Sequence, residues 1–213
     1  MIQRVEVADV FAENAYFYID PQSGQGFLID PGANAPLLYD IIRQNGFDIQ
    51  AILLTHGHFD HTGAIAELHE KLGLPYYISP EGQAYLTDPR LNLSAECGRY
   101  SVLPDAGFFR EGDFIHVPAN PSFGLQVIAT PGHTPDSVTF YSAAEKSAFV
   151  GDAIFRGSPG TSQFPGGNGR QLLASIRERI LTLPDDVTLY SGHTPPTSVG
   201  REKPGYMLSS EGF

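Results

Sequence analysis

The stretch Ile52-Leu-Leu-Thr-His56-Gly-His58-Phe-Asp60-His61-Thr-Gly63 places four side chains that can bind a metal ion within six residues. The apolar run at residues 51–54 is typical of a buried strand, and residues 64–72 have apolar positions at helical spacing. The turn between a strand and a helix is where a parallel sheet presents a functional site. Two imidazoles separated by one glycine can face one cation, and the carboxylate and imidazole that follow can face a second. The spacing therefore predicts two adjacent metal ions.

Each of these side chains, taken alone, has a simpler explanation. A single histidine beside a strand is usually a hydrogen-bonded structural residue, and Asp60 could cap a helix that begins near His61. The four together favour a metal site, because unpartnered polar side chains gathered under a sheet edge would be costly.

Three further motifs lie far along the chain, and each places a candidate ligand just after an expected strand. These motifs are Thr130-Pro-Gly-His133-Thr-Pro-Asp-Ser137, Phe149-Val-Gly-Asp152 and Tyr190-Ser-Gly-His193-Thr. With His56-Gly-His58-Phe-Asp60-His61, which resembles the H-x-H-x-D-H signature, they resemble the ordered motif set of the metallo-β-lactamase superfamily. The resemblance extends from about Asn14 to Thr197.

The resemblance implies a metal centre built from seven side chains. In that arrangement metal 1 is held by His56, His58 and His133, metal 2 is held by Asp60, His61 and His193, and Asp152 bridges the two ions. Imidazole and carboxylate ligands suit two divalent ions, with zinc preferred and iron or manganese as alternatives. Asp60 is also the expected catalytic residue, because it would orient the attacking hydroxide.

Periodicity along the chain predicts an α/β protein. Strands are expected at residues 2–8, 14–19, 26–29, 51–54, 75–78, 113–117, 125–129, 137–141, 148–150 and 187–190. Helices are expected at residues 35–43, 64–72 and 171–180, with a helical turn at 80–86. Residues 88–105 lack periodicity and are expected to form a loop that borders the site. Two β-rich halves with outer helices predict a single domain over residues 1–213, folded as a four-layer αββα sandwich, which the resemblance also implies.

Composition limits the partners and the compartment. The 13 Lys and Arg residues against 24 Asp and Glu residues give a net charge of −11, which argues against binding nucleic acid or anionic membranes. No run approaches the ~20 apolar residues of a membrane span, and the N-terminus lacks the apolar core of a secretory signal. Cys97 is the only cysteine, so no intrachain disulfide can form. We expect a cytoplasmic protein that acts on a small molecule, while its oligomeric state is not indicated.

The expected chemistry is hydrolysis of an activated acyl bond by a metal-bound hydroxide. Zinc lowers the pKa of a bound water from ~15.7 to ~7, and a metal ion can also stabilise the tetrahedral oxyanion. Gly151-Asp-Ala-Ile-Phe-Arg-Gly-Ser158 and Ser191-Gly-His-Thr-Pro-Pro-Thr197 are similar to the glyoxalase II-like branch, especially its short members. That resemblance implies a thioesterase, since the branch hydrolyses S-acylglutathione.

Two departures from that branch bear on the substrate. Gly160-Thr-Ser-Gln163 stands where the branch usually has Gly-Arg-Thr-Asp, and the chain ends at Phe213 without the helical domain that supplies glutathione contacts in long members. The cations near the motifs are Arg156, Arg170, Arg201 and Lys203, and all except Arg156 are interpreted as solvated surface charges. We therefore expect weak recognition of glutathione.

Two other functions remain open for the same residues. A persulfide dioxygenase, which resembles this branch, would use one iron held by His58 and its neighbours. A lactonase would open a cyclic ester with the same apparatus. His69 and His116 fall outside the motifs and are expected to be exposed structural residues.

Overall fold

Two six-stranded sheets form the middle of the protein, and the computed structural model describes residues 1–207. The first sheet has the order β1 (Ile2–Ala8), β2 (Ala12–Ile19), β3 (Gln25–Ile29), β4 (Asp48–Leu53), β5 (Tyr76–Ile78) and β6 (Gly107–Phe108). The second has the order β14 (Thr197–Ser198), β13 (Thr188–Ser191), β10 (Ser147–Gly151), β9 (Val138–Ser142), β8 (Asn120–Ala129) and β7 (Phe114–Val117). Residues 208–213 of the predicted domain lie outside the described residues, so the extent of the domain stays a prediction.

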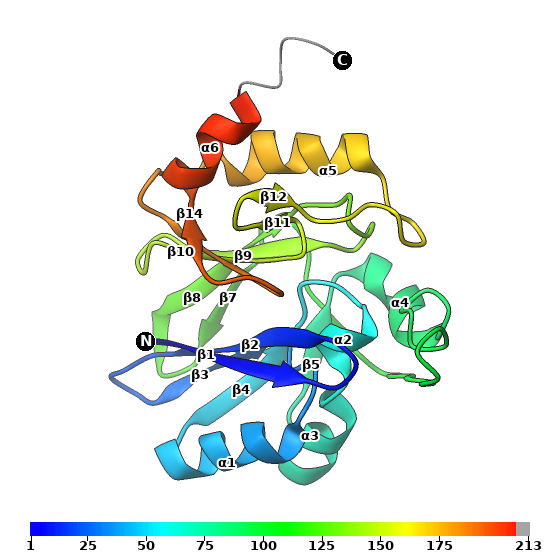
Figure 1. Cartoon of the computed structure of the whole chain (residues 1–213). Helices are drawn as coiled ribbons and strands as arrows, with labels where there is room; N and C mark the ends of the chain where they lie inside the picture. The colour runs from blue at the N-terminus through cyan, green and yellow to red at the C-terminus, as the bar shows by residue number, and fades with distance from the viewer. Residues whose placement is uncertain (208–213) are drawn as a thin grey trace.

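Helices cover the outer face of each sheet, which gives four layers (Figure 1). Beside the first sheet lie α1 (Ala35–Asn45) and α3 (Ile65–Leu72), and beside the second lie α5 (Gly169–Ser175), a π-helical turn Ile176–Ile180 and α6 (Val199–Met207). The remaining elements are α2 (Phe59–Thr62), a 3₁₀ turn Pro80–Gly82, α4 (Gln83–Thr87) and a small hairpin of β11 (Ile154–Phe155) and β12 (Ser158–Pro159). The predicted four-layer αββα sandwich is confirmed.

Apolar clusters fill the spaces between the layers, and side chains alternate along β2 to serve two of them. Tyr16 and Tyr18 belong to the cluster between the two sheets, whereas Phe17 and Ile19 belong to the cluster beneath α1 and α3. Another cluster joins the second sheet to α5 and α6. Because successive side chains of a strand point to opposite faces, β2 can be apolar at every one of these positions.

Strand β2 also joins the first sheet to a loop of the second. The hydroxyl of Tyr16 donates to the carbonyl of Ser191 at 2.6 Å. Asn14 Nδ2 donates to the carbonyls of Ser191 and Thr194 at 3.0 and 3.1 Å. These bonds hold the segment that carries His193 against the first sheet.

Some details differ from the sequence prediction. The predicted helix 171–180 is α-helical only to Ser175 and continues as a π-helical turn. Helix α6 follows the predicted last strand although Gly200, Pro204 and Gly205 lower its helix propensity, which is why periodicity did not indicate it.

Other expectations about the surface agree with the structure. Residues 88–105 are irregular, and His69 and His116 are exposed, as predicted. Within residues 1–207 no helix is both long and apolar enough to cross a membrane. The cytoplasmic location stays a prediction.

The packing of Gly132 against α5 generates a stability prediction. Gly132 has φ +138°, and a Cβ atom there would lie 2.2 Å from the backbone nitrogen of Leu172. Gly132→Ala combines backbone strain with overpacking and is expected to lower the free energy of unfolding by ~2–5 kcal/mol. Gly112→Ala is the control, because Gly112 has φ +85° with no atom within 4 Å of the added Cβ, so only strain applies. Urea denaturation measures both, and equal losses for the two variants would contradict the packing argument.

Candidate metal centre

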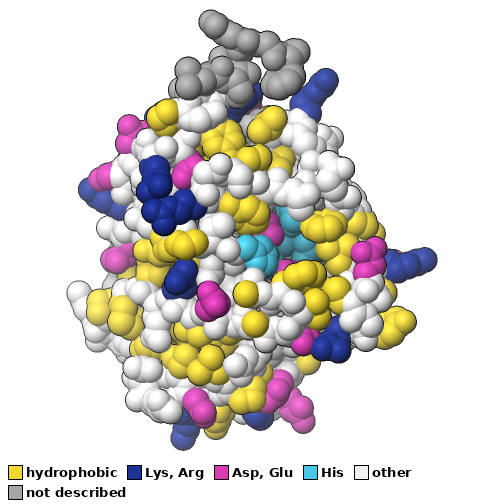
Figure 2. Space-filling model, in the orientation of Figure 1, with side chains coloured by type: hydrophobic (Ala, Val, Ile, Leu, Met, Phe, Trp, Pro, Cys, Tyr) yellow, Lys and Arg dark blue, Asp and Glu magenta, His cyan; other side chains and the backbone are white. Residues whose placement is uncertain are grey.

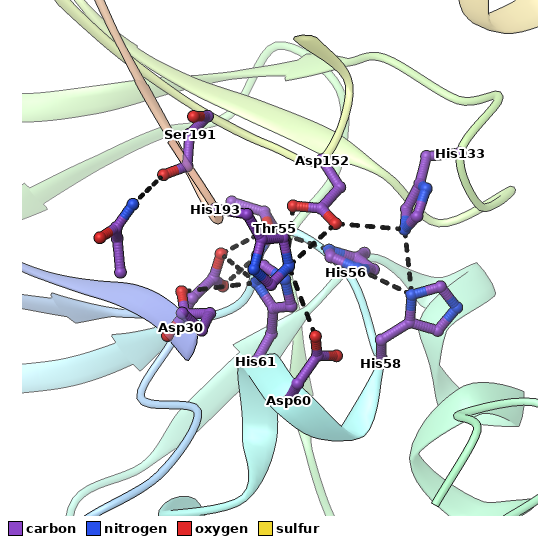
Figure 3. Close-up of polar contacts among 12 residues, drawn as sticks. Asp30, Thr55, His56, His58, Asp60, His61, His133, Asp152, Ser191 and His193 are labelled. Carbon is purple, nitrogen blue, oxygen red and sulfur yellow. Dashed lines mark hydrogen bonds and ion pairs between the residues drawn. The ribbon is translucent and has the colours of Figure 1, made fainter. Parts of the chain in front are cut away.

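The seven predicted ligands come from four separate stretches of the chain and meet at one edge of the sandwich (Figure 3). The loop after β4 and the short helix α2 carry four of them, and the other three follow β8, β10 and β13: His56, His58, Asp60, His61, His133, Asp152 and His193. In Figure 3, Asp152 lies between the group of His56, His58 and His133 and the group of Asp60, His61 and His193. The structure therefore brings together every residue of the predicted set. Their roles as ligands stay predictions.

Three imidazole nitrogens converge in the first group. His58 Nδ1 lies 3.1 Å from His56 Nε2 and 3.0 Å from His133 Nε2. All three side chains are buried. Neutral imidazole offers one donor and one acceptor, so three facing nitrogens cannot all be satisfied by bonds among themselves. Such a cluster of lone pairs suits one cation.

The second group mixes imidazole with carboxylate. His193 Nε2 lies 3.4 Å from Asp60 Oδ2, and one ligand atom from each of Asp60, His61 and His193 falls within 4.8 Å of the others. Asp60 and His61 are neighbours on α2, whereas His193 arrives from the second sheet. The group is thus completed only when both halves of the fold are in place.

Asp152 connects the two groups. Its Oδ2 atom lies 3.3 Å from His193 Nε2 and 3.7 Å from His133 Nε2, and its Oδ1 atom lies 3.5 Å from His61 Nε2. Among the described residues, the buried atoms Asp152 Oδ1 and His61 Nε2 have no hydrogen-bond partner. Buried polar atoms are rarely left without one unless an ion or water completes them. The residues present therefore fit a pair of divalent ions.

The outer nitrogens of the histidines decide which nitrogen faces the centre. His133 Nδ1 lies 2.7 Å from the carbonyl of Thr161, and His193 Nδ1 lies 2.7 Å from that of Ala12. A carbonyl can only accept, so each Nδ1 carries a proton, and Nε2 is the nitrogen that faces the centre and is available to a metal ion in the neutral imidazole. Outer contacts of this kind orient metal-binding histidines.

Two buried carboxylates behind His61 were missed by the sequence analysis. Asp30 Oδ2 lies 3.1 Å from His61 Nδ1 and accepts the Thr55 hydroxyl at 2.6 Å, while Asp30 Oδ1 accepts the Thr55 N–H at 2.8 Å. These bonds hold Asp30 at φ +48°, a left-handed conformation that is uncommon outside glycine. Glu13 Oε1 lies 3.7 Å from the same His61 nitrogen. The available signal was the position of Asp30 at the end of β3, beside the strand that leads to the metal-binding turn.

Two histidines of the first group, His56 and His58, are held in the neutral form by their surroundings. Burial, followed by the neighbouring imidazoles, holds the pKa of His56 well below its ordinary value. Burial and the nearby His133 lower the pKa of His58 to about 3. Neutral imidazole is the form that binds metal, so little proton competition is expected at His56 and His58 at neutral pH.

The second group holds charge in the metal-free protein. Burial alone would lower the pKa of His193, but contacts with Asp152 and Asp60 raise it to about 10. Burial likewise opposes protonation of His61, yet Asp152 and Asp30 hold the pKa of His61 well above its usual range. Burial would raise the pKa of Asp152, but His61 and His193 hold it well below the ordinary value. A dication can replace these protons between the carboxylates.

The mouth of the centre is a cavity of about 350 Å³ with mainly apolar walls. Besides metal-centre residues, it is lined by Phe11, Ala12, Phe59, Leu93, Phe155, Thr161 and Phe164. Leu93 belongs to the irregular segment 88–105, so the expectation that this loop borders the site is confirmed. Arg156 and Arg201 line a different cavity, of about 700 Å³.

Comparison with known proteins gives a consistent result for the family. Residues 8–193 match the family described as the metallo-beta-lactamase superfamily. The chain is 38% identical to the probable metallo-hydrolase YqgX of Bacillus subtilis, over 94% of this chain and 93% of that protein. It is 33% identical to the hydroxyacylglutathione hydrolase GloC of Haemophilus influenzae, over 91% of each.

Solved structures resemble the whole chain. The BLEG-1 B3 metallo-beta-lactamase superposes with a TM-score of 0.90 at 31% identity, covering 99% of this chain and 100% of that one. TTHA1623 in a di-iron-bound form superposes with a TM-score of 0.83 at 35% identity, covering 94% of this chain and 96% of that one.

The ligand geometry predicts how metal binding responds to substitution. Metal-free protein is expected to take up two divalent ions per chain, and Asp60→Ala is expected to take up one. Asp30→Asn should retain two ions but bind one of them ~10–100-fold more weakly, because Asp30 orients His61 from behind. Asp40→Asn, an exposed carboxylate on α1, is the matched control. Calorimetric titration with zinc measures the stoichiometry and both affinities, and two undiminished affinities in Asp60→Ala would contradict the assignment.

The pKa shifts predict how stability of the metal-free protein depends on pH. The pKa of His193 is raised to about 10 in the folded protein, against ~6.5 in the unfolded chain. Its contribution to folding stability is therefore fully present below pH ~6.5 and is lost as pH rises towards 10. The pKa of His58 is lowered to about 3 in the folded protein, against ~6.5 in the unfolded chain. Its contribution to folding stability is therefore fully present above pH ~6.5 and is lost as pH falls towards 3.

The thermal midpoint of the metal-free protein should therefore fall on both sides of pH ~6.5. His193→Gln should flatten the alkaline side and His58→Gln the acid side. Thermal scans in chelator across this pH range test the expectation, and unchanged slopes in both variants would refute it.

Proposed function

We propose that this chain, which belongs to the metallo-beta-lactamase superfamily, is a hydrolase that uses two metal ions to cleave a thioester or a related activated acyl bond. The observation that carries the proposal is the position of Asp152 between two complete sets of ligand side chains. A single-metal site would need only one of these sets.

The reaction proposed is addition of water across the carbonyl carbon–sulfur bond. The oxygen of water bonds to the carbonyl carbon, the carbon–sulfur bond breaks, and the sulfur leaves with a proton as a thiol. When bound, two divalent ions would supply an activated water molecule and polarise the carbonyl oxygen. Asp60 would orient the nucleophile, because it is one of the three residues of the second ligand set and also lines the mouth.

Other residues of the chain would prepare the site for this reaction. The carbonyls of Thr161 and Ala12 accept from Nδ1 of His133 and His193 and so turn Nε2 of each ring towards the centre. Phe155 and Phe164 line the mouth beside the metal ligands and would reduce the access of bulk water. Exclusion of water strengthens electrostatic interactions at the reacting carbonyl.

The proposal of a thioester as substrate is supported by the similarity to the GloC hydroxyacylglutathione hydrolase. Dependence on glutathione is not part of the proposal, because no Lys or Arg lines the mouth among the described residues. Arg156 lies beyond Phe155 in the separate cavity.

Three alternative reactions serve as outcomes of the same test. An oxidation at a single iron is disfavoured by the completeness of the second ligand set. Opening of a lactone, or of a lactam as the similarity to BLEG-1 suggests, would need the same apparatus. We propose zinc as the metal, with iron as its main competitor, since TTHA1623 is described with two irons.

The test is a substrate panel applied to protein loaded separately with zinc, iron and manganese. We expect acyl thioesters to give the highest kcat/KM, with lactones and β-lactams lower and no thiol-dependent oxygen uptake. Asp60→Ala should reduce kcat/KM at least ~100-fold, which corresponds to ~2.7 kcal/mol of lost transition-state stabilisation. It should change the unfolding midpoint of the metal-free protein little, because Asp60 is not a core residue.

Asp40→Ala controls for loss of a carboxylate on the surface and should keep parental turnover. Oxygen consumption with one iron per chain would overturn the hydrolase proposal. Near-parental turnover of Asp60→Ala would remove the role assigned to that side chain.

A further inference from the structure

Aromatic rings stand on opposite sides of the metal centre. The ring of Phe164 has its centroid 5.6 Å from that of His58 and 6.1 Å from that of His133. The ring of Phe155 has its centroid 5.9 Å from that of His193. A scissile bond placed across the two groups would therefore have Phe164 on one side and Phe155 on the other.

The outer wall of the mouth is also apolar. Phe11 is 51% exposed and stacks at a tilt against Phe59 with centroids 6.1 Å apart, while Phe164 is 39% exposed. Leu93 closes the wall from the irregular loop. Figure 2 shows histidine side chains reaching the surface in the middle of one face, with hydrophobic side chains on both sides of them. Exposed apolar surface grouped around a cavity commonly marks a ligand-binding site.

The charged side chains at the mouth all belong to the metal centre. Among the described residues that line the cavity, the acidic side chains are Asp60 and Asp152, both in the metal centre, and there is no Lys or Arg. An anionic group held against the apolar rings, away from the metal centre, would lose water without gaining a Lys or Arg partner. An apolar group would instead displace water from the rings, which is favourable.

We infer that the centre takes acyl thioesters or esters that are apolar and uncharged on both sides of the scissile bond. This inference rests on the proposed hydrolase function and names its substrate class. Phe155 and Phe164 are the specificity-determining residues, and Phe11 and Leu93 extend the same surface outwards. Charged parts of a substrate must lie beyond the reach of these four side chains.

The experiment compares acyl groups on a constant thiol, N-acetylcysteamine, with zinc-loaded protein. From acetyl to hexanoyl, kcat/KM should rise by about two- to fourfold for each methylene that becomes buried. The succinyl thioester should be at least ~10-fold poorer than the butyryl thioester. With a constant butyryl group, glutathione as the leaving thiol should give no advantage over N-acetylcysteamine.

Variants test which residues cause the preference. One of the two variants Phe164→Ala and Phe155→Ala, the one whose ring faces the acyl group, should reduce the chain-length dependence, mainly by raising KM for the longer acyl groups. The other should leave the acyl chain-length dependence and weaken the preference for an apolar thiol. Phe114→Ala is the matched control, because Phe114 is a half-exposed phenylalanine on β7 that does not line this cavity. It should leave both kcat and the chain-length dependence unchanged.

The outcomes separate the inference from the proposed function. Hydrolysis with no chain-length dependence, or with a preference for succinyl or glutathionyl substrates, overturns the inference and leaves the hydrolase standing. Absence of hydrolysis for every thioester and ester overturns the proposed function.

A binding measurement keeps the inference testable in that second case. Butanethiol should bind to zinc-loaded protein at least ~10-fold more tightly than 3-mercaptopropionate, as measured by calorimetry. The same preference should shrink in one of the variants Phe164→Ala and Phe155→Ala. Equal or reversed affinities of the two thiols overturn the inference whether or not turnover is seen.

Discussion

The burial of Asp152 between imidazoles is the constraint on which the rest of the site depends. A carboxylate that is only 8% exposed is unfavourable unless positive charge lies close to it. Here the compensation comes from His61 on α2 and from His193 after β13, which hold the pKa of Asp152 well below its ordinary value. Those two histidines come from different halves of the fold, one after the first sheet's β4 and one after the second sheet's β13, so the layered fold is what brings the charges together. In the same position a pair of dications would meet ligands already oriented for them.

Residues of the fold and residues of the site overlap along β2. Tyr16 contributes its ring to the cluster between the sheets and its hydroxyl to Ser191. A few residues earlier, Ala12 and Asn14 hold His193 and the loop around it through hydrogen bonds. A substitution in this strand is therefore expected to act both on stability and on the position of a predicted metal ligand. In this way β2, near the N-terminus, helps to position His193, the last of the predicted ligands in the sequence.

Much of the site could be predicted from sequence because its ligands follow strands in short local motifs. The αββα layering was also predictable, since apolar runs and helical spacing mark most elements. Glu13 and Asp30 were not predicted, because a single carboxylate forms no local sequence pattern. The hydrogen-bond partner of Asp30, Thr55, is also 25 residues away in the sequence. Phe11, Phe155 and Phe164 escaped for a similar reason: each is an ordinary apolar residue until the fold places it beside the centre. Helix α6 escaped because its glycines and proline weaken the helical signal.

The hydrogen bond from His193 to Ala12 joins residues 181 positions apart, and it has a consequence for the order of assembly. The side chains His56, His58 and His133 are all present once two thirds of the chain has been made, whereas the second ligand set waits for β13 to dock beside β10. Contacts that close long loops form late in folding, because their entropy must be overcome before they contribute. Capture of the second metal ion would thus report that the two ends of the protein have met.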